Sequence, residues 1–279
     1  MEETETIMAA LSTLTPAQLS DLTRSILSAT LRHQRRLSSL LSSPTLFSLT
    51  LHYLHKLSLS QKALLIARHL ISSLHLFTHH FQPSKAVSAP PLSTAIRQRE
   101  LDAVLLLLLL CETHQHSPKA IEAPYSAWRE NLTNLFSETL LTVSSSSIGA
   151  CTATILIPYI EMVTRCRRFM GLMGCGGSNG EKEPAEVAAA ATAVVALPAV
   201  EVTVGGTECV ICKEEMRIGR DVCELPCQHL FHWTCVLPWL SERNTCPCCR
   251  FRLPSDDVFQ EIERLWEVLV KMGGREPCD

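Results

Sequence analysis

Along roughly the first 170 residues, apolar side chains recur every three or four positions, which is the spacing of one helix face. Thr15-Pro16 predicts the start of a helix, because threonine can cap the first turn and proline tolerates the first helical position. The apolar positions of this helix are Leu19, Leu22, Ile26 and Leu27. Pro44 closes the segment, since proline disfavours helical dihedral angles in the residue before it.

Five more helices follow from the same periodicity. The second covers about residues 46–57, and the third opens at Ser60 and continues to about residue 74. After a loop marked by Pro83 and Pro90-Pro91, the pattern resumes over residues 96–111, 128–141 and 155–170. The pattern therefore predicts a mainly α-helical domain over residues 1–173, built as an all-α bundle.

The composition changes abruptly after this helical region. Residues 171–184 contain five of the eleven glycines, and an Ala/Val-rich stretch follows as far as Val204. We interpret residues 174–205 as a flexible Gly/Ala-rich linker. This division leaves a small module at residues 206–253 and a C-terminal helix and tail at residues 254–279.

The C-terminal helix has signals at both of its ends. Ser255 can cap it, and Asp256 and Asp257 suit the positive end of the helix dipole. Gly273-Gly274 is expected to end it. Its apolar stripe consists of Phe259, Ile262, Leu265, Trp266 and Leu269. Such a stripe either packs on a neighbouring surface of the chain, which is the simpler interpretation, or docks a partner.

Charge is segregated along the chain, although the net charge is only −3. No Asp or Glu lies between Thr23 and Arg99, whereas this block carries ten Lys and Arg residues. A basic block of this kind faces an anionic membrane surface or an acidic protein partner, or else forms ordinary solvated helix faces. Nucleic-acid binding is disfavoured, because the block lacks interleaved aromatic residues and base-stacking motifs.

Neither of the two apolar runs predicts a transmembrane segment. Residues 104–111 (VLLLLLLC) lie between Asp102 and Glu112 and are far shorter than the ~20 residues of a spanning helix. The run at residues 187–197 is mostly alanine and is broken by Pro198. The acid-poor, Ser/Arg-rich composition is also typical of plastid transit peptides, but the acidic start MEETETIMAAL and the helical pattern argue against one. The same start lacks the features of a secretory signal.

Eight of the thirteen cysteines fall within the 41 residues from Cys209 to Cys249. Clustered cysteines without a secretory signal indicate metal binding before disulfides. The potential ligands follow the pattern C-x2-C-x14-C-x-H-x2-H-x2-C-x10-C-x2-C and are Cys209, Cys212, Cys227, His229, His232, Cys235, Cys246 and Cys249. Eight Cys and His ligands suffice for two tetrahedral zinc sites without an open position.

This pattern, with histidine in both the fourth and the fifth place, resembles the RING-H2 finger family. The resemblance implies a small α+β cross-brace finger that holds two Zn²⁺ ions. One ion would be bound by Cys209, Cys212, His232 and Cys235, and the other by Cys227, His229, Cys246 and Cys249. A PHD finger would need cysteine in place of His229. Cys223 and Cys248 are spare, and we expect a packed or partly exposed thiol at each; the alternative is a catalytic thiol at Cys248, as in ligases with tandem fingers.

The finger has no carboxylate pair, no Ser/His/Asp arrangement and no open metal position, so it has no reaction chemistry of its own. Resemblance to the RING family implies an E3 ubiquitin ligase, which docks a ubiquitin-conjugating enzyme and promotes transfer of its thioester-linked ubiquitin to a substrate lysine, without a covalent intermediate on the ligase. By the same resemblance, Ile211, Trp239 and Pro247 contact the conjugating enzyme, and Arg250 bridges that enzyme and ubiquitin. The alternative is a non-enzymatic adaptor whose finger mediates protein assembly.

Three N-terminal stretches extend the resemblance to most of the chain. IMAALSTLTPAQLSDL, LSSPTLFSLTL and LDAVLLLLLLCETHQ resemble plant RING ligases that are associated with amyloplasts and shoot gravitropism. This resemblance implies a peripheral position on the cytosolic side of the amyloplast surface, where the ligase would control plastid movement or attachment. Without it, the expected location is cytoplasmic. Ubiquitin and its conjugating enzymes are cytosolic and nuclear, so import into the plastid would isolate the ligase from them.

Overall fold

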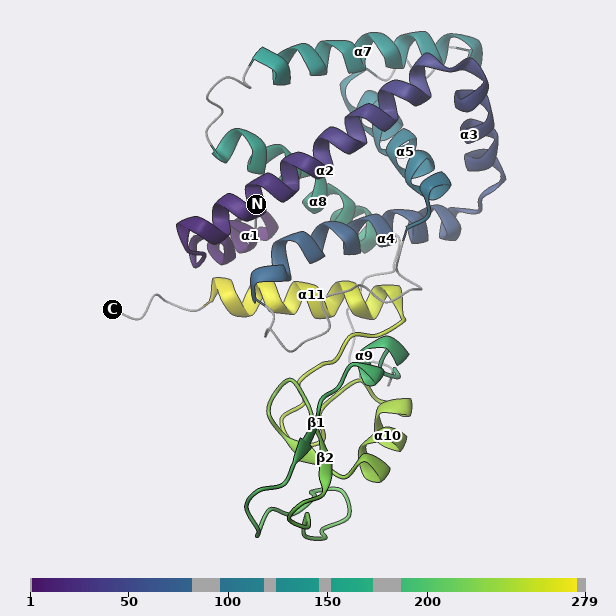
Figure 1. Ribbon diagram of the computed structural model, residues 1–279. Helices are drawn as coiled ribbons and strands as arrows, with labels where there is room; N and C mark the ends of the chain where they lie inside the picture. The colour runs from purple at the N-terminus through teal and green to yellow at the C-terminus, as the bar shows by residue number, and fades with distance from the viewer. Residues whose placement is uncertain (1, 82–95, 118–123, 146–151, 173–186, 275–279) are drawn as a thin grey trace.

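The computed structural model describes residues 2–81, 96–117, 124–145, 152–172 and 187–274. Helices dominate it, and a small three-stranded sheet lies near the C-terminus (Figure 1). The helices of the N-terminal region are α1 (Glu2–Ser12), α2 (Pro16–Ser42), α3 (Pro44–Lys56), α4 (Leu59–Thr78), α5 (Gln98–His116), α7 (Tyr125–Ser145) and α8 (Thr152–Leu172), with a 3₁₀ turn, η1 (His79–Phe81), after α4. The later helices are α9 (Ala191–Val195), α10 (Trp233–Glu242) and α11 (Val258–Gly273). The predicted combination of a helical region and a small α+β finger is confirmed.

Capping side chains set the helix starts. Thr15 caps α2 as predicted, because its Oγ1 accepts a hydrogen bond from Gln18 N at 3.3 Å and Gln18 Oε1 accepts one from Thr15 N at 3.0 Å. The cap of α4 is Ser58 rather than Ser60, through the same reciprocal pair with Gln61. Sequence spacing alone did not separate two serines so close together.

One hydrophobic core lies between α1, α2, α4, α8 and α11. Helix α4 is central to it and buries Ala63, Ala67, Leu70, Ile71 and Leu74 completely. The periodicity did not predict α1, because its buried side chains, Ile7, Ala10 and Leu11, span little more than one turn. Packing against this core therefore stabilises a helix whose own sequence signal is weak.

A second core lies between α2, α3, α4, α5 and α7. Val104 and Leu106, from the leucine-rich run, are fully buried in it. Two ion pairs join α5 to its neighbours: Arg36 binds both oxygens of Asp102 at 2.9 and 2.6 Å, and Arg68 binds Glu100 at 3.1 Å. Two cations of the basic block, Arg36 and Arg68, therefore stabilise the packing of the helices. Among the helices that the structure describes, none has the length and hydropathy for a membrane crossing.

The sheet belongs to the finger and includes a strand that precedes it. Strands β1 (Ala199–Glu201), β2 (Asp221–Glu224) and β3 (Leu230–Phe231) are antiparallel, in the order β1-β2-β3. Strand β1 and helix α9 lie within residues 174–205, which the composition indicates as a flexible linker.

For residues 187–205 the linker interpretation does not hold. The backbone N of Asn244 donates to the O of Val187 at 2.7 Å, and the N of Ala189 donates to the O of Leu240 at 2.9 Å. Val202 is 5% exposed and packs in the finger core. Small side chains permit this close packing, and composition alone does not separate close packing from flexibility. The remainder of the predicted linker, residues 174–186, lies outside the described residues.

Helix α11 is capped by Asp257 and not by Ser255. Asp257 Oδ1 accepts hydrogen bonds from Phe259 N at 3.0 Å and Gln260 N at 2.8 Å, whereas Ser255 Oγ accepts one from Asp257 N at 3.1 Å. The predicted apolar stripe packs on the same chain, where Leu265 and its neighbours are buried against α4 and α1 (Figure 1). The helix ends at Gly273, as predicted.

Candidate metal centres

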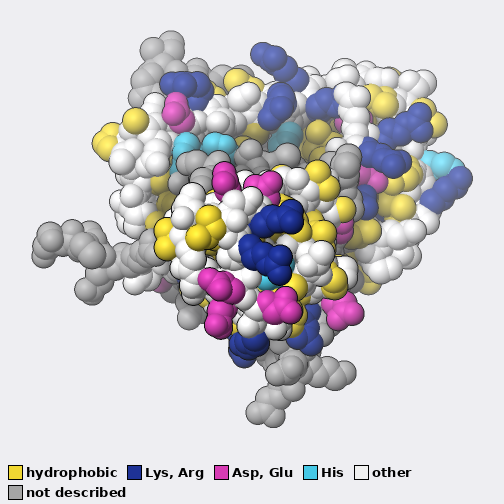
Figure 2. All heavy atoms as spheres, turned by 60° about the horizontal axis from the view of Figure 1, so that its bottom comes forward, with side chains coloured by type: hydrophobic (Ala, Val, Ile, Leu, Met, Phe, Trp, Pro, Cys, Tyr) yellow, Lys and Arg dark blue, Asp and Glu magenta, His cyan; other side chains and the backbone are white. Residues whose placement is uncertain are grey.

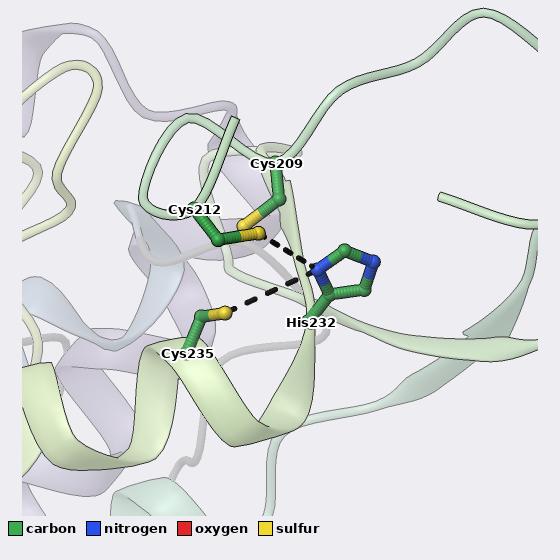
Figure 3. Close-up of side chains that lie close together, drawn as sticks. All are labelled: Cys209, Cys212, His232 and Cys235. Atoms are coloured by element: carbon green, nitrogen blue, oxygen red, sulfur yellow. Dashed lines mark hydrogen bonds between the residues drawn. The ribbon is translucent and has the colours of Figure 1, made fainter. Parts of the chain in front are cut away.

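Four predicted ligands converge at the first centre (Figure 3). Cys209 and Cys212 come from one loop, while His232 and Cys235 stand at the start of α10. The Sγ atoms of Cys212 and Cys235 lie 3.4 and 4.0 Å from Nδ1 of His232. All four ligand atoms lie within 4.8 Å of one another. These side chains therefore surround one point that an ion can occupy.

The second centre is built in the same way from the other four ligands. Cys227 and His229 flank a turn before β3, and Sγ of Cys227 lies 3.3 Å from Nδ1 of His229. Cys246 and Cys249 belong to a loop near the end of the finger, and all four ligand atoms again lie within 4.8 Å of one another. The ligand pairs thus alternate between the two centres along the chain, so the cross-brace grouping is confirmed.

Two residues with left-handed backbone dihedral angles shape the Cys-x-x-Cys loops. Lys213 and Arg250 directly follow the second cysteine of their loops and have φ angles of 64° and 59°. The N of Lys213 donates to the O of Cys209 at 2.7 Å, and the N of Arg250 donates to the O of Cys246 at 3.0 Å. Each loop therefore turns back on itself, which brings its two cysteines to the same side.

Zinc fits both centres. A tetrahedral Zn²⁺ with ordinary Zn–S and Zn–N bonds places sulfur and nitrogen ligands about 3.6 Å apart. The measured sulfur–nitrogen separations of 3.3 to 4.0 Å bracket this value. Burial and the neighbouring thiols raise the pKa of Cys227 to about 12 and that of Cys235 to about 11. Cysteine binds zinc as the thiolate, so a bound Zn²⁺ would hold these groups deprotonated.

The two spare cysteines contribute to neither centre. Cys223 lies on β2, is fully buried in the finger core, and has a pKa that burial raises to about 11. Cys248 is exposed, and its N donates to Sγ of Cys246 at 3.4 Å. Partial burial and the neighbouring Cys246 raise the pKa of Cys248, whereas an activated nucleophilic thiol requires a lowered pKa.

The four other predicted site residues lie on the zinc loops and on α10. Ile211 is 36% exposed in the first loop, Pro247 is half-buried in the last loop, and Arg250 is exposed beyond it. Trp239 is half-buried on α10, and its Nε1 donates to Thr245 O at 2.7 Å. The indole therefore ties α10 to the last zinc loop.

Sequence reasoning missed two exposed apolar residues beside these positions. Val210 is 45% exposed and Leu237 is 42% exposed. An apolar residue next to a zinc ligand, or on the same helix as the half-buried Trp239, would have been the signal, but exposure itself does not follow from the sequence.

The comparisons with known proteins place the finger and the whole chain in context. The Ring finger domain family matches residues 207–250. An Arabidopsis thaliana protein, E3 ubiquitin-protein ligase SGR9, amyloplastic, is 54% identical over 97% of this chain and 96% of its own length. E3 ubiquitin-protein ligase RING1-like, from the same plant, is 48% identical over 22% of this chain and 20% of its own length. E3 ubiquitin-protein ligase RNF126 of Xenopus tropicalis is 49% identical over 23% of this chain and 22% of its own length. No solved structure matches the chain.

Proposed function

Because the chain belongs to the family of RING-type E3 ubiquitin-protein ligases, we propose that its finger docks a ubiquitin-conjugating enzyme and promotes transfer of thioester-linked ubiquitin to a substrate lysine. As a member of this family the chain is an E3 ubiquitin transferase. Bound zinc supplies structure and no reaction chemistry, since protein ligands take all four of its positions. The finger therefore acts by positioning the two reactants.

Exposed apolar side chains on a rigid support carry the proposal for docking. Val210, Ile211 and Leu237 remain between 36% and 45% exposed, although the finger has only a small apolar core. On α10, which also carries Leu237, Trp239 is held by its bond to Thr245 and by the guanidinium of Arg243, which lies 4.7 Å from the ring centroid. Exposed apolar groups on such a support suit a small, transient protein interface.

Arg250 is the cation best placed to act on the bound ubiquitin thioester. Its backbone is fixed by the bond to Cys246, while its side chain is exposed. Within the described residues no carboxylate forms an ion pair with it. The planar guanidinium has five donors and can bridge two acceptors, one on the conjugating enzyme and one on ubiquitin.

Replacement of Arg250 by asparagine is expected to slow ubiquitin discharge roughly 10- to 100-fold, because a hydrogen bond from a charged group contributes about 1.5–3 kcal/mol. Asparagine tolerates the φ of 59° at this position, so the backbone of the zinc loop is retained. The measurement is single-turnover discharge of ubiquitin from a charged conjugating enzyme onto free lysine.

The matched control is Lys213→Asn, because Lys213 has a φ of 64° at the same place in the other loop. This variant should discharge ubiquitin at the wild-type rate. Equal loss in both variants would show a general effect on the finger and would contradict the role of Arg250. A zinc-loaded wild type that is inactive with a panel of conjugating enzymes would favour the non-enzymatic adaptor.

The amyloplastic relative aligns with almost the whole chain, and this supports a proposal for location. The ligase sits on the cytosolic side of the amyloplast surface and acts in shoot gravitropism by controlling plastid movement or attachment. On that side it meets ubiquitin and the conjugating enzymes, which are cytosolic and nuclear.

Helix α3 offers a face for peripheral attachment. Leu49 and Tyr53 are 68% and 37% exposed, and His52 and Lys56 lie on the same face at helical spacing. Leu59, at the start of α4, is 60% exposed. Figure 2 shows Lys and Arg side chains gathered toward the right of the helical region, which is the side of α3 in Figure 1. A basic surface with apolar side chains fits an anionic membrane.

Protease added to intact plastids is expected to digest the plastid-bound protein, because the proposed position exposes it to the cytosol. Immunoblotting of the isolated organelles, with a stromal protein as the protected control, measures this. Protection that persists until the envelope is lysed would contradict the cytosolic orientation.

A further inference from the structure

The helix that follows the finger belongs to the core of the N-terminal helical region. Ile262, Leu265 and Leu269 of α11 are at most 4% exposed and share one core with α1, α2, α4 and α8. At the far end of α11, a Cβ added to Gly273 would lie only 3.1 Å from the Cβ of Ala9, so α11 and α1 are in close contact. Helices α1 and α11 thus close one helical domain, and the finger is inserted between α8 and α11 (Figure 1).

The joint between the finger and α11 is short and bonded on both sides. It consists of residues 254–257. On the finger side, Pro254 O accepts from Ala190 N at 2.8 Å. On the α11 side, Ser255 N donates to Oε2 of Glu261 at 3.2 Å, and Ser255 is 0% exposed. A joint whose backbone groups are held in this way does not act as a free hinge.

Two ion pairs hold this joint in one geometry. Arg264 donates to both carboxylate oxygens of Glu261, at 2.8 and 2.6 Å, and the two residues are 6% and 0% exposed. Because the same carboxylate accepts from Ser255, this buried pair positions the joint. Arg252, in the final strand-like segment of the finger, pairs with Glu267 of α11 at 2.8 Å. The bidentate pair of Arg264 with Glu261 contributes geometric specificity as well as binding energy.

We propose that this joint fixes the orientation of the finger relative to the helical domain and thereby determines which lysines receive ubiquitin. Arg252, Glu261, Arg264 and Glu267 are its positioning residues. The inference rests on the proposed function, in which the finger carries the charged conjugating enzyme. A thioester presented by a fixed finger reaches only the lysines held in one region of space, whether on a bound substrate or on the chain itself. A freely moving finger would reach many more.

The test separates orientation from activity. The joint variant combines two changes. About twelve Gly/Ser residues inserted between Pro254 and Ser255 add a flexible span of roughly 20 Å. Glu267→Ala removes the ion pair with Arg252 that would still hold the finger against α11. Discharge onto free lysine is expected to stay within about twofold of wild type, because the finger retains its docking surface. The distribution of self-ubiquitylation among Lys56, Lys62 and Lys271, mapped by mass spectrometry at a dilution where the reaction is intramolecular, is expected to change at least about threefold.

The same insert placed after Gly274, with Glu267 intact, is the matched control and should give the wild-type lysine pattern. An unchanged pattern in the joint variant would overturn the proposal.

Nitrogen-15 relaxation checks the orientation without any ligase activity: the finger and the helical domain should tumble together in the wild type and separately in the joint variant. A finger that tumbles independently in the wild type would also overturn it. A wild type that discharges no ubiquitin would contradict the proposed function. The relaxation data would still decide whether the joint fixes the orientation of the finger relative to the helical domain.

Discussion

Replacement of His232 by alanine is expected to unfold the finger while the helical domain stays folded. The finger core is small, and zinc binding contributes on the order of 10–16 kcal/mol in comparable modules. Loss of one ligand at the first centre therefore removes a large part of the free energy that keeps this small finger folded. The helical domain is spared because its two cores share no buried residue with the finger core.

Zinc content and the amide spectrum measure this result. The wild type should carry two zinc ions, one for each ligand cluster, and the variant should lose the dispersed amide signals of the finger. Cys248→Ser is the matched control, because Cys248 lies among the ligands but belongs to neither cluster. A His232→Ala protein that keeps two zinc ions and a folded finger would contradict the assignment of the first centre.

Deletion of residues 255–279 is expected to prevent stable folding of the helical domain. The deletion removes five large buried side chains from the first core, those of Val258, Ile262, Leu265, Trp266 and Leu269. At about 1.5–3 kcal/mol for each buried side chain, the loss is roughly 8–15 kcal/mol, which is the whole stability of a typical domain. It also removes the contact of the Arg167 guanidinium, 3.7 Å from the ring centroid of Trp266.

Thermal unfolding followed by circular dichroism measures the effect of this deletion. A shorter deletion, residues 275–279, is the control, because it leaves α11 complete and should keep the wild-type melting temperature. A synthetic peptide of residues 255–274, added to the larger deletion, should restore cooperative unfolding. If the larger deletion melts at the wild-type temperature, α11 is not part of this core.

The zinc ligands were accessible from the sequence because the pairs are close together in it. Cys-x-x-Cys spacing, as in Cys209 and Cys212, suits a tight turn, and eight ligands suffice for two ions. The alternating grouping came from family resemblance and agrees with the geometry. Exposure of Val210 and Leu237 was not accessible, because it depends on which side chains the surrounding loops leave uncovered.

The sequence by itself determined the features that depend on neighbouring residues: the cap at Thr15, the apolar face of α11, its end at Gly273, and the metal ligands. Only the tertiary structure decided where these parts go. Residues 187–205 had the composition of a linker but pack on the finger through Val202, and Gly273 permits a close approach of α1 besides ending its helix. The physical reason is that these outcomes depend on contacts between distant segments, such as that of Arg167 with Trp266, and local periodicity carries no information about them.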